Sequence, residues 1–257
     1  MSIISIAREE MLIFFLIICR ITGLFLLVSP FNDENIKPLF RMSFAIAIAV
    51  LFYSQISMVI QPAVLAVGNN GIGIMMLIAI ELALGFALGI IVKTLILSIQ
   101  VAGITIASQI GLSSAALMDP AQQHQNSVLG IFLTLLTTLM ILEYGLHIRI
   151  ISGFLDSYNK IPVGSFLNNY DDFTSVFIQS VGKMWSTGIN ISMPFIIVNI
   201  LLLIGTGVLA KLMPQLQIFF LILPIQILVG VVMFIGVLSG LLFWFLEFFT
   251  NELNLLF

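Results

Sequence analysis

The chain has 257 residues, of which 60% are hydrophobic and only 8% are charged, and its formal net charge is -3. Soluble domains are about 45 to 50% apolar and about 25% charged, so this composition excludes a soluble globular protein and indicates an integral membrane protein. No basic cluster occurs, which removes the usual signature of nucleic-acid binding and leaves apolar protein surfaces and lipid as expected partners.

Apolar runs separated by helix breakers predict the elements of the first half. The first helix is expected from about Met11 to Val28, and the second from Leu39 to Val67. The third run, Ile74 to Met118, is too long for one straight crossing of a bilayer, which needs about 20 residues. We therefore expect it to bend, tilt or form a hairpin, and the expected places are Lys93, Gln100, Gly103 and Gln109.

The second half continues with a fourth helix, expected from Val128 to about Ile151, and a polar segment over residues 156–172. The last two apolar runs, Val181–Ala210 and Leu216–Phe249, flank a short turn and predict a helical hairpin. No strand-like alternation and no repeat of fixed period occurs in the sequence. The predicted fold class is an all-α integral membrane protein with long, partly bent apolar helices and hairpins.

Polar side chains interrupt the apolar runs. An ionisable group at a helix centre costs about 2.5 to 3.5 kcal/mol on insertion scales, so it should pair, face protein or line water. Such groups often stabilise helix–helix or subunit contacts. The set comprises Arg20, Glu81, Lys93, Gln100, Gln109, Glu143, His147, Asn190 and Asn199.

Small residues recur at helical spacing in the third run. Gly85 and Gly89 are four positions apart, as are Ala83 and Ala87 beside them. A small residue every fourth position lets two membrane helices approach closely. The spacing predicts a close helix contact here.

Two patterns in the sequence bear on catalysis and metal binding. Glu143 and His147 lie one turn apart on the expected fourth helix, where two side chains can meet. A zinc protease helix needs two His and a third ligand, whereas the other His of this chain, His124, lies in a polar stretch. The segment Gly111–Ser114 lacks the Gly-x-Ser-x-Gly elbow of serine hydrolases. We therefore expect no enzyme, no catalytic residue, no metal and no cofactor.

Several motifs follow one another in a recognisable order: "CRITGLFLLVSPF", "KPLFRMSFAIAIA", "IELALGFALG", "QVAGITIASQIGLSSAALMDP", "GLHIRIISGFLDSYNKIPVG" and "MPFIIVNILLLIGTGVLAKLMPQLQIFFLILP". This order resembles the FliR family of flagellar biosynthetic proteins, whose virulence counterparts are the T subunits of type III injectisomes. The most specific pieces are the Q-x-G-L-S-x-A-x-x-x-D-P block and the M-P-Q-L-x-I-F turn. Ser114 departs from the family, where Phe is often found.

The resemblance implies a subunit of the flagellar type III export gate, present in one copy in a hetero-oligomer with P and Q subunits. It implies one membrane domain over residues 1–257, in which about 1–175 are P-like and include a pore loop at 109–127, and about 176–257 form a Q-like hairpin. Further implied partners are the B subunit, unfolded export substrates and lipid. The implied location is the bacterial inner membrane within the flagellar basal body.

The resemblance also implies that the polar loop reaches into the pore and plugs it, because polar backbone at membrane depth is tolerated where protein encloses it. A glycine that permits turns, a helix-stopping Asp-Pro and apolar fillers suit this role. The implied plug residues are Gly111, Leu112, Ser113, Ser114, Leu117, Met118, Asp119 and Pro120. The expected assembly contacts are Arg20, Gln100, Gln109, Asn199, Lys211, Pro214 and Gln215.

Three alternatives stay open at this point. The alternative within the family is a virulence export-gate subunit, whereas Gly145–His147 and Asp156–Gly164 resemble flagellar members more. A small-solute transporter would carry inverted repeats around a midplane site, and the sequence has no visible repeat. The polar loop also fits an ordinary exposed turn between two helices.

Overall fold

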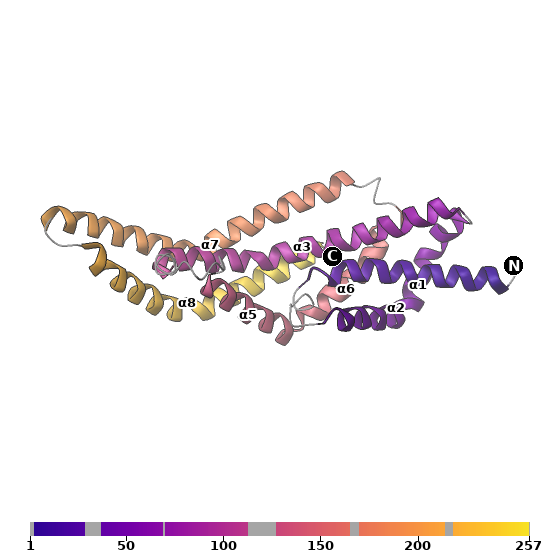
Figure 1. Ribbon diagram of the computed structural model, residues 1–257, viewed down its shortest axis with the longest axis horizontal. Coiled ribbons are helices and arrows are strands. Elements are labelled where there is room, and N and C mark those ends of the chain that lie inside the picture. Colours follow the sequence, from indigo (N-terminus) through magenta and orange to yellow (C-terminus); the bar gives the residue numbers. More distant parts are fainter. Residues whose placement is uncertain are drawn as a thin grey trace. The chain divides into compact units, whose positions relative to one another are not determined.

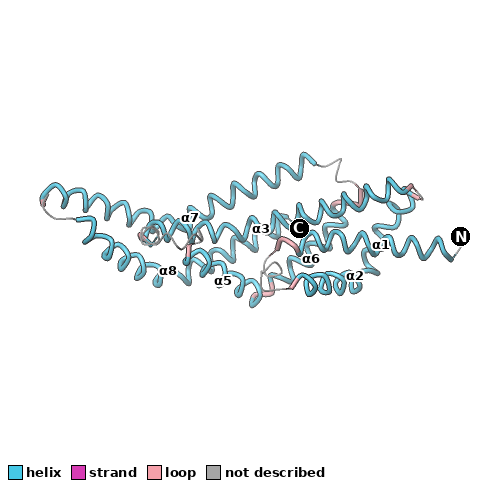
Figure 2. Tube along the Cα trace, viewed as in Figure 1, coloured by secondary structure: helices cyan, strands magenta, loops and turns pink. Residues whose placement is uncertain are grey.

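A computed structural model describes residues 3–28, 37–68, 70–112, 127–164, 170–213 and 218–256 (Figure 1). Figure 2 shows that the regular elements in this part of the chain are helices, which confirms the all-α class. The helices are α1 (Ile3–Phe25), α2 (Pro38–Val67), α3 (Gly71–Ile110), α5 (Val128–Glu143), α6 (Leu146–Lys160), α7 (Tyr170–Leu212) and α8 (Ile218–Leu256).

Four of these helices are long and apolar enough to cross a membrane. Among the described residues they cover Pro38–Val67, Gly71–Ile110, Thr174–Leu212 and Ile222–Leu256. Proline lies inside three of them, at Pro62, Pro194 and Pro224. Membrane helices tolerate such prolines because neighbouring groups satisfy the freed backbone.

The chain divides into two compact units. The first comprises Met1–Leu95, Gly145–Ser180 and Glu252–Phe257, and the second comprises Ile96–Tyr144 and Val181–Asn251. The predicted P-like and Q-like parts concern likeness to other subunits, so that division stays a prediction.

In the first unit, α1 packs against α2 and against the first part of α3. Aromatic pairs join α1 to α2, with ring centroids 5.5 Å apart for Phe25 and Phe44. Between α1 and α3 the contact is made by glycines. A Cβ on Gly23 would lie 2.8 Å from the backbone nitrogen of Phe86, and a Cβ on Gly85 would collide with the backbone carbonyl of Arg20. The close contact predicted from the glycine spacing is confirmed.

In the second unit, the last part of α3 is the common partner of other helices. A Cβ on Gly103 would lie 2.5 Å from the Cα of Gly130 on α5. A Cβ on Gly188 of α7 would lie 2.7 Å from Val101. Buried Ser192 donates a hydrogen bond to the carbonyl of Ala102 at 3.3 Å. Small residues thus bring α5 and α7 against the same stretch of α3.

Of the bend, tilt or hairpin expected for the third run, the hairpin is excluded within the described residues, because α3 is one continuous helix of 40 residues (Figure 1). Gly103 stays within the helix. Because it has no side chain, Gly130 can pack closely against it. The described part of the helix ends at Ile110, and the rest of the expected run lies outside the described residues.

The expected fourth helix is corrected into two. Its start is confirmed, since Ser127 caps α5 and its hydroxyl accepts from the Gly130 amide at 3.4 Å. The helix ends at Glu143, and Gly145 adopts a left-handed φ of 69° before α6 begins. Glu143 and His147 were expected on one helix face. That expectation is wrong, because the helix breaks between them.

The expected polar segment is also partly helical. Residues up to Lys160 form the last turns of α6, and α7 already begins at Tyr170. Burial explains the difference, since Ser157 and Tyr158 are buried in the first unit. The final pair of helices is confirmed as α7 and α8, both longer than expected, while residues 214–217 of the turn lie outside the described part.

Candidate functional site

A buried ionic cluster joins three helices of the first unit. Arg20 of α1 donates to both carboxylate oxygens of Glu81 on α3, at 2.6 Å and 2.9 Å, and both side chains are fully buried. The guanidinium also donates to the carbonyl of Ile161 at 3.4 Å and to Ser157 Oγ at 3.5 Å. Its Cζ lies 4.0 Å from the ring centroid of Tyr158 on α6.

The buried guanidinium charge of Arg20 would be costly without partners, and this geometry supplies them. A planar guanidinium binds a carboxylate with two parallel bonds and stacks on an aromatic face at the same time. The expectation that ionisable groups in apolar runs are paired is confirmed for Arg20 and Glu81. The predicted assembly role of Arg20 stays a prediction, and any such role acts through the helices that it joins.

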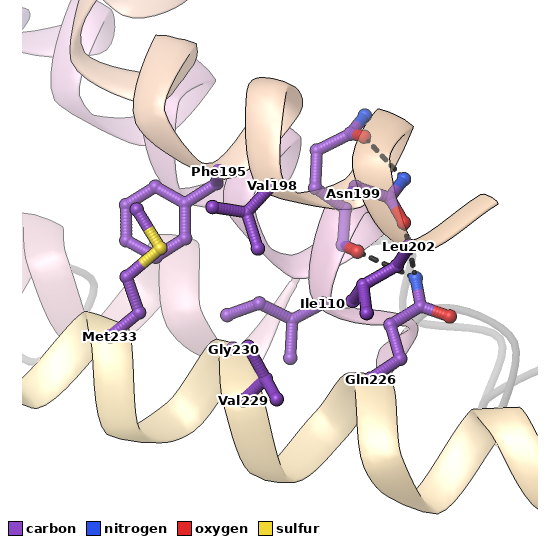
Figure 3. A pocket seen from close by; sticks show the side chains of 10 residues that line it. Ile110, Phe195, Val198, Asn199, Leu202, Gln226, Val229, Gly230 and Met233 are labelled. Atoms are coloured by element: carbon purple, nitrogen blue, oxygen red, sulfur yellow. Dashed lines mark hydrogen bonds between the residues drawn. The ribbon is translucent and has the colours of Figure 1, made fainter. Parts of the chain in front are cut away.

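A second cluster, the amide cluster, joins three helices of the second unit where α3 ends. It consists of Gln109 on α3, Asn199 on α7 and Gln226 on α8. Gln226 Nε2 donates to the backbone carbonyl of Gln109 at 2.7 Å and to Asn199 Oδ1 at 2.9 Å. Asn199 Nδ2 donates to Gln109 Oε1 at 2.7 Å. All three side chains are half-buried and line a small pocket (Figure 3).

Gly111, the residue directly after α3, ends the helix in a turn. Gly111 is buried and has a φ of 87°, a conformation that glycine adopts at little cost. Its amide donates to the carbonyl of Ser108 at 3.2 Å, which closes the last turn. A Cβ on Gly111 would lie 3.4 Å from the side-chain amide carbon of Gln226. The predicted entry to the polar loop is therefore a tight turn packed on the amide cluster.

The other predicted residues fall in different places. Leu112 and Gln100 are half-buried, and Lys211 is exposed near the end of α7. Gln109 and Asn199 are brought together within the chain. Both are predicted assembly contacts, and that role stays a prediction. The remaining plug and turn residues lie outside the described part: Ser113, Ser114, Leu117, Met118, Asp119, Pro120, Pro214 and Gln215.

Sequence reasoning did not single out Gln226. The signal was present, because Gln226 is an amide within the otherwise apolar stretch from Phe219 to Phe234. Its role depends on tertiary structure, because α3 and α7 bring Gln109 and Asn199 beside it.

Comparisons with known proteins all point to bacterial export proteins. The family described as "Bacterial export proteins, family 1" matches residues 11–252. The flagellar biosynthetic protein FliR of Bacillus subtilis (strain 168) is 29% identical over 229 residues, which is 88% of this chain and 86% of that protein. FliR of Caulobacter vibrioides is 24% identical over 226 residues, 88% of each chain. FliR of Aquifex aeolicus is 29% identical over 231 residues, 89% of this chain and 86% of that protein.

Proposed function

Because the chain belongs to family 1 of the bacterial export proteins, we propose that it forms, with P and Q subunits, the pore of the flagellar type III export gate. It is a component of the flagellar export apparatus in the inner membrane. Unfolded flagellar proteins would leave the cytoplasm through this pore. The proposed role is structural, with no catalytic residue and no cofactor assigned.

The observation that carries the assembly part of the proposal is the apolar surface of α7. Between Lys183 and Lys211 the helix has no charged residue. At about 1.5 Å per residue this stretch is roughly 40 Å long, whereas the hydrocarbon core of a bilayer is about 30 Å thick. In the most apolar 18-residue stretch of α7, only 6% of the positions are buried within the chain. Partner helices would cover what neither lipid nor this chain covers.

The direction of the exposed side chains supports the same reading. Leu203, Ile204 and Leu209 are 56%, 60% and 49% exposed. On an α-helix these positions point in directions at least about 100° apart. A helix that is apolar on several sides is typical of one surrounded by lipid or by other helices. The pairing of α7 with α8 fits the proposed Q-like hairpin.

The relatives described above are flagellar proteins, which favours a flagellar over a virulence system. We further propose that the loop from Gly111 to Gln125 is the seal of the resting pore. A pore wide enough for an unfolded chain leaks ions unless something occupies it reversibly. Apolar side chains such as Leu112 can fill an opening by dispersion contacts that a passing substrate can displace.

Deleting residues 112–118 tests the seal. The complex with P and Q subunits should still assemble, because the deletion leaves Gln109, Asn199 and Gln226 in place, and ion permeability at rest should rise. Flux of a small ion or dye is measured in cells, with assembly followed by co-purification of the partner subunits. An assembled complex with wild-type leakage would show that the loop is an ordinary turn.

A further inference from the structure

The last turn of α3 is held by a neighbouring helix. Carbonyls in the last turn of a helix have no amide partner further along that helix and need one from elsewhere. The carbonyl of Gln109 belongs to this turn, and the side chain of Gln226 on α8 donates to it at 2.7 Å. Gln226 therefore caps α3 from outside.

Asn199 orients this cap. Its Oδ1 accepts from the same Gln226 nitrogen at 2.9 Å, and its Nδ2 holds the Gln109 side chain at 2.7 Å. Each of these hydrogen bonds crosses from one helix to another, so the cluster fixes the end of α3 on α7 and α8 together. Figure 3 shows the side chains of Asn199 and Gln226 converging on this point.

An apolar contact one turn along α8 completes the attachment. Ile110 is buried and points between Val198 of α7 and Gly230 of α8 (Figure 3). A Cβ on Gly230 would lie 2.5 Å from Ile110 Cγ1, so the missing side chain of Gly230 makes room for Ile110. Gln226 and Gly230 thus bind consecutive residues at the end of α3 from one face of α8.

We propose that Asn199 and Gln226 are positioning residues that determine where the chain leaves α3 and hence where Leu112 and the loop begin. The inference rests on the proposed function of that loop as the seal. Neutral amides suit the task, because each carries both donor and acceptor and can exchange partners without leaving a charge among apolar helices. An ion pair here would hold more rigidly and would leave a buried charge when opened.

The first test measures the accessibility of position 112, which changes when the start of the loop moves. Cys19, the single cysteine of the chain, is first replaced by alanine. Leu112→Cys in this background is then labelled with a membrane-impermeant thiol reagent in assembled complexes. Gln226→Leu should change the labelling rate because α3 loses its cap, and Asn199→Leu should change it because the cap loses the group that orients it. Asn251→Leu is the matched control, since this amide lies exposed on the same helix α8 as Gln226 and should label as wild type.

The second test measures leakage in the same variants without the added cysteine. Gln226→Leu and Asn199→Leu should leak toward the level of the 112–118 deletion, and Asn251→Leu should not. Adding Ile110→Cys and Gly230→Cys to Gln226→Leu allows a disulfide, called the lock here, to hold the end of α3 on α8 in place of the cap. The two Cβ positions lie within reach of a disulfide after a small shift, since a Cβ on Gly230 would be 2.9 Å from that of Ile110. Oxidation should restore low leakage.

Wild-type labelling of Leu112→Cys in assembled Gln226→Leu and Asn199→Leu complexes would overturn the inference. So would a fully formed lock that leaves leakage high. Changed labelling with wild-type leakage would support the positioning role and contradict the seal. If Gln226→Leu does not assemble, Gln226→Met takes its place as a flexible apolar substitute. Failure of both, with Asn251→Leu assembled, would make Gln226 merely structural.

Discussion

At the scale of single residues, the guanidinium of Arg20 is the most demanding group in the first unit. It is fully buried, binds Glu81 with two hydrogen bonds and lies over the ring of Tyr158. Removing a charge pair from water is costly, and a buried pair is weak evidence of net stabilisation. What the pair does provide is a strong penalty against any packing that separates α1 from α3.

Replacing one partner should therefore be far worse than replacing both. Arg20→Met should destabilise the first unit by about 3 to 5 kcal/mol, because Glu81 is left buried without a partner. The double variant Arg20→Met with Glu81→Leu should recover most of this loss. Thermal unfolding of the purified complex measures the effect. Equal loss in the single and double variants would mean that the charges themselves are required.

At the scale of elements, helix contacts are set by positions that carry no side chain. Gly85 of α3 faces the backbone of Arg20, and Gly103 of the same helix faces Gly130 of α5. Without a Cβ, the two backbones of each pair come close enough for extensive van der Waals contact, which is a main source of helix association in membranes. By contrast, Gly182 on α7 has open space around it.

Alanine substitution should distinguish a glycine packed on a neighbouring backbone, such as Gly85, from one with open space around it, such as Gly182. Gly85→Ala should destabilise by about 1 to 3 kcal/mol, because its Cβ meets backbone atoms that move only with the helix. Gly182→Ala is the matched control, and it should be neutral or stabilising by up to about 1 kcal/mol, since Ala favours helix over Gly. The midpoint of thermal unfolding reports both. A Gly85→Ala complex as stable as wild type would rule out tight packing of α1 on α3.

At the scale of the whole molecule, the uncharged stretch of α7 is longer than the hydrocarbon core of a bilayer is thick. Exposed large apolar side chains occur along both α7 and α8, among them Leu201, Val208, Leu228 and Val232. Large contiguous apolar patches mark interaction sites, and lipid accommodates only the part within its hydrocarbon thickness. Partner subunits are proposed to cover the remainder.

We expect the chain alone to be unstable in detergent and to become stable when produced with P and Q subunits. Size-exclusion chromatography and thermal unfolding of the two preparations make the comparison, with the deletion of 112–118 as a variant that should still assemble. A monodisperse, thermally stable monomer would contradict the assembly part of the proposed function.

Most of the helical architecture was determined by the sequence itself. Apolar runs and their breakers predicted α2 to within a residue at its start and located the α7 and α8 pair. They did so because a lipid-exposed backbone must satisfy its own hydrogen bonds, so a long apolar run has hardly any structure available other than helix. The glycine spacing in α3 and the need of Arg20 for a partner followed from equally local rules.

Tertiary structure alone decided which glycines bend the chain and which groups meet. Gly103 stays helical because Gly130 packs on it, whereas Gly145 takes a left-handed turn and ends α5 near Glu143. Likewise, Gln109 and Gln226 are 117 positions apart, and nothing local to either indicates that one caps the other's helix. The physical reason is that a glycine or an amide is compatible with several local conformations and partners, and only the packing of distant helices selects one of them.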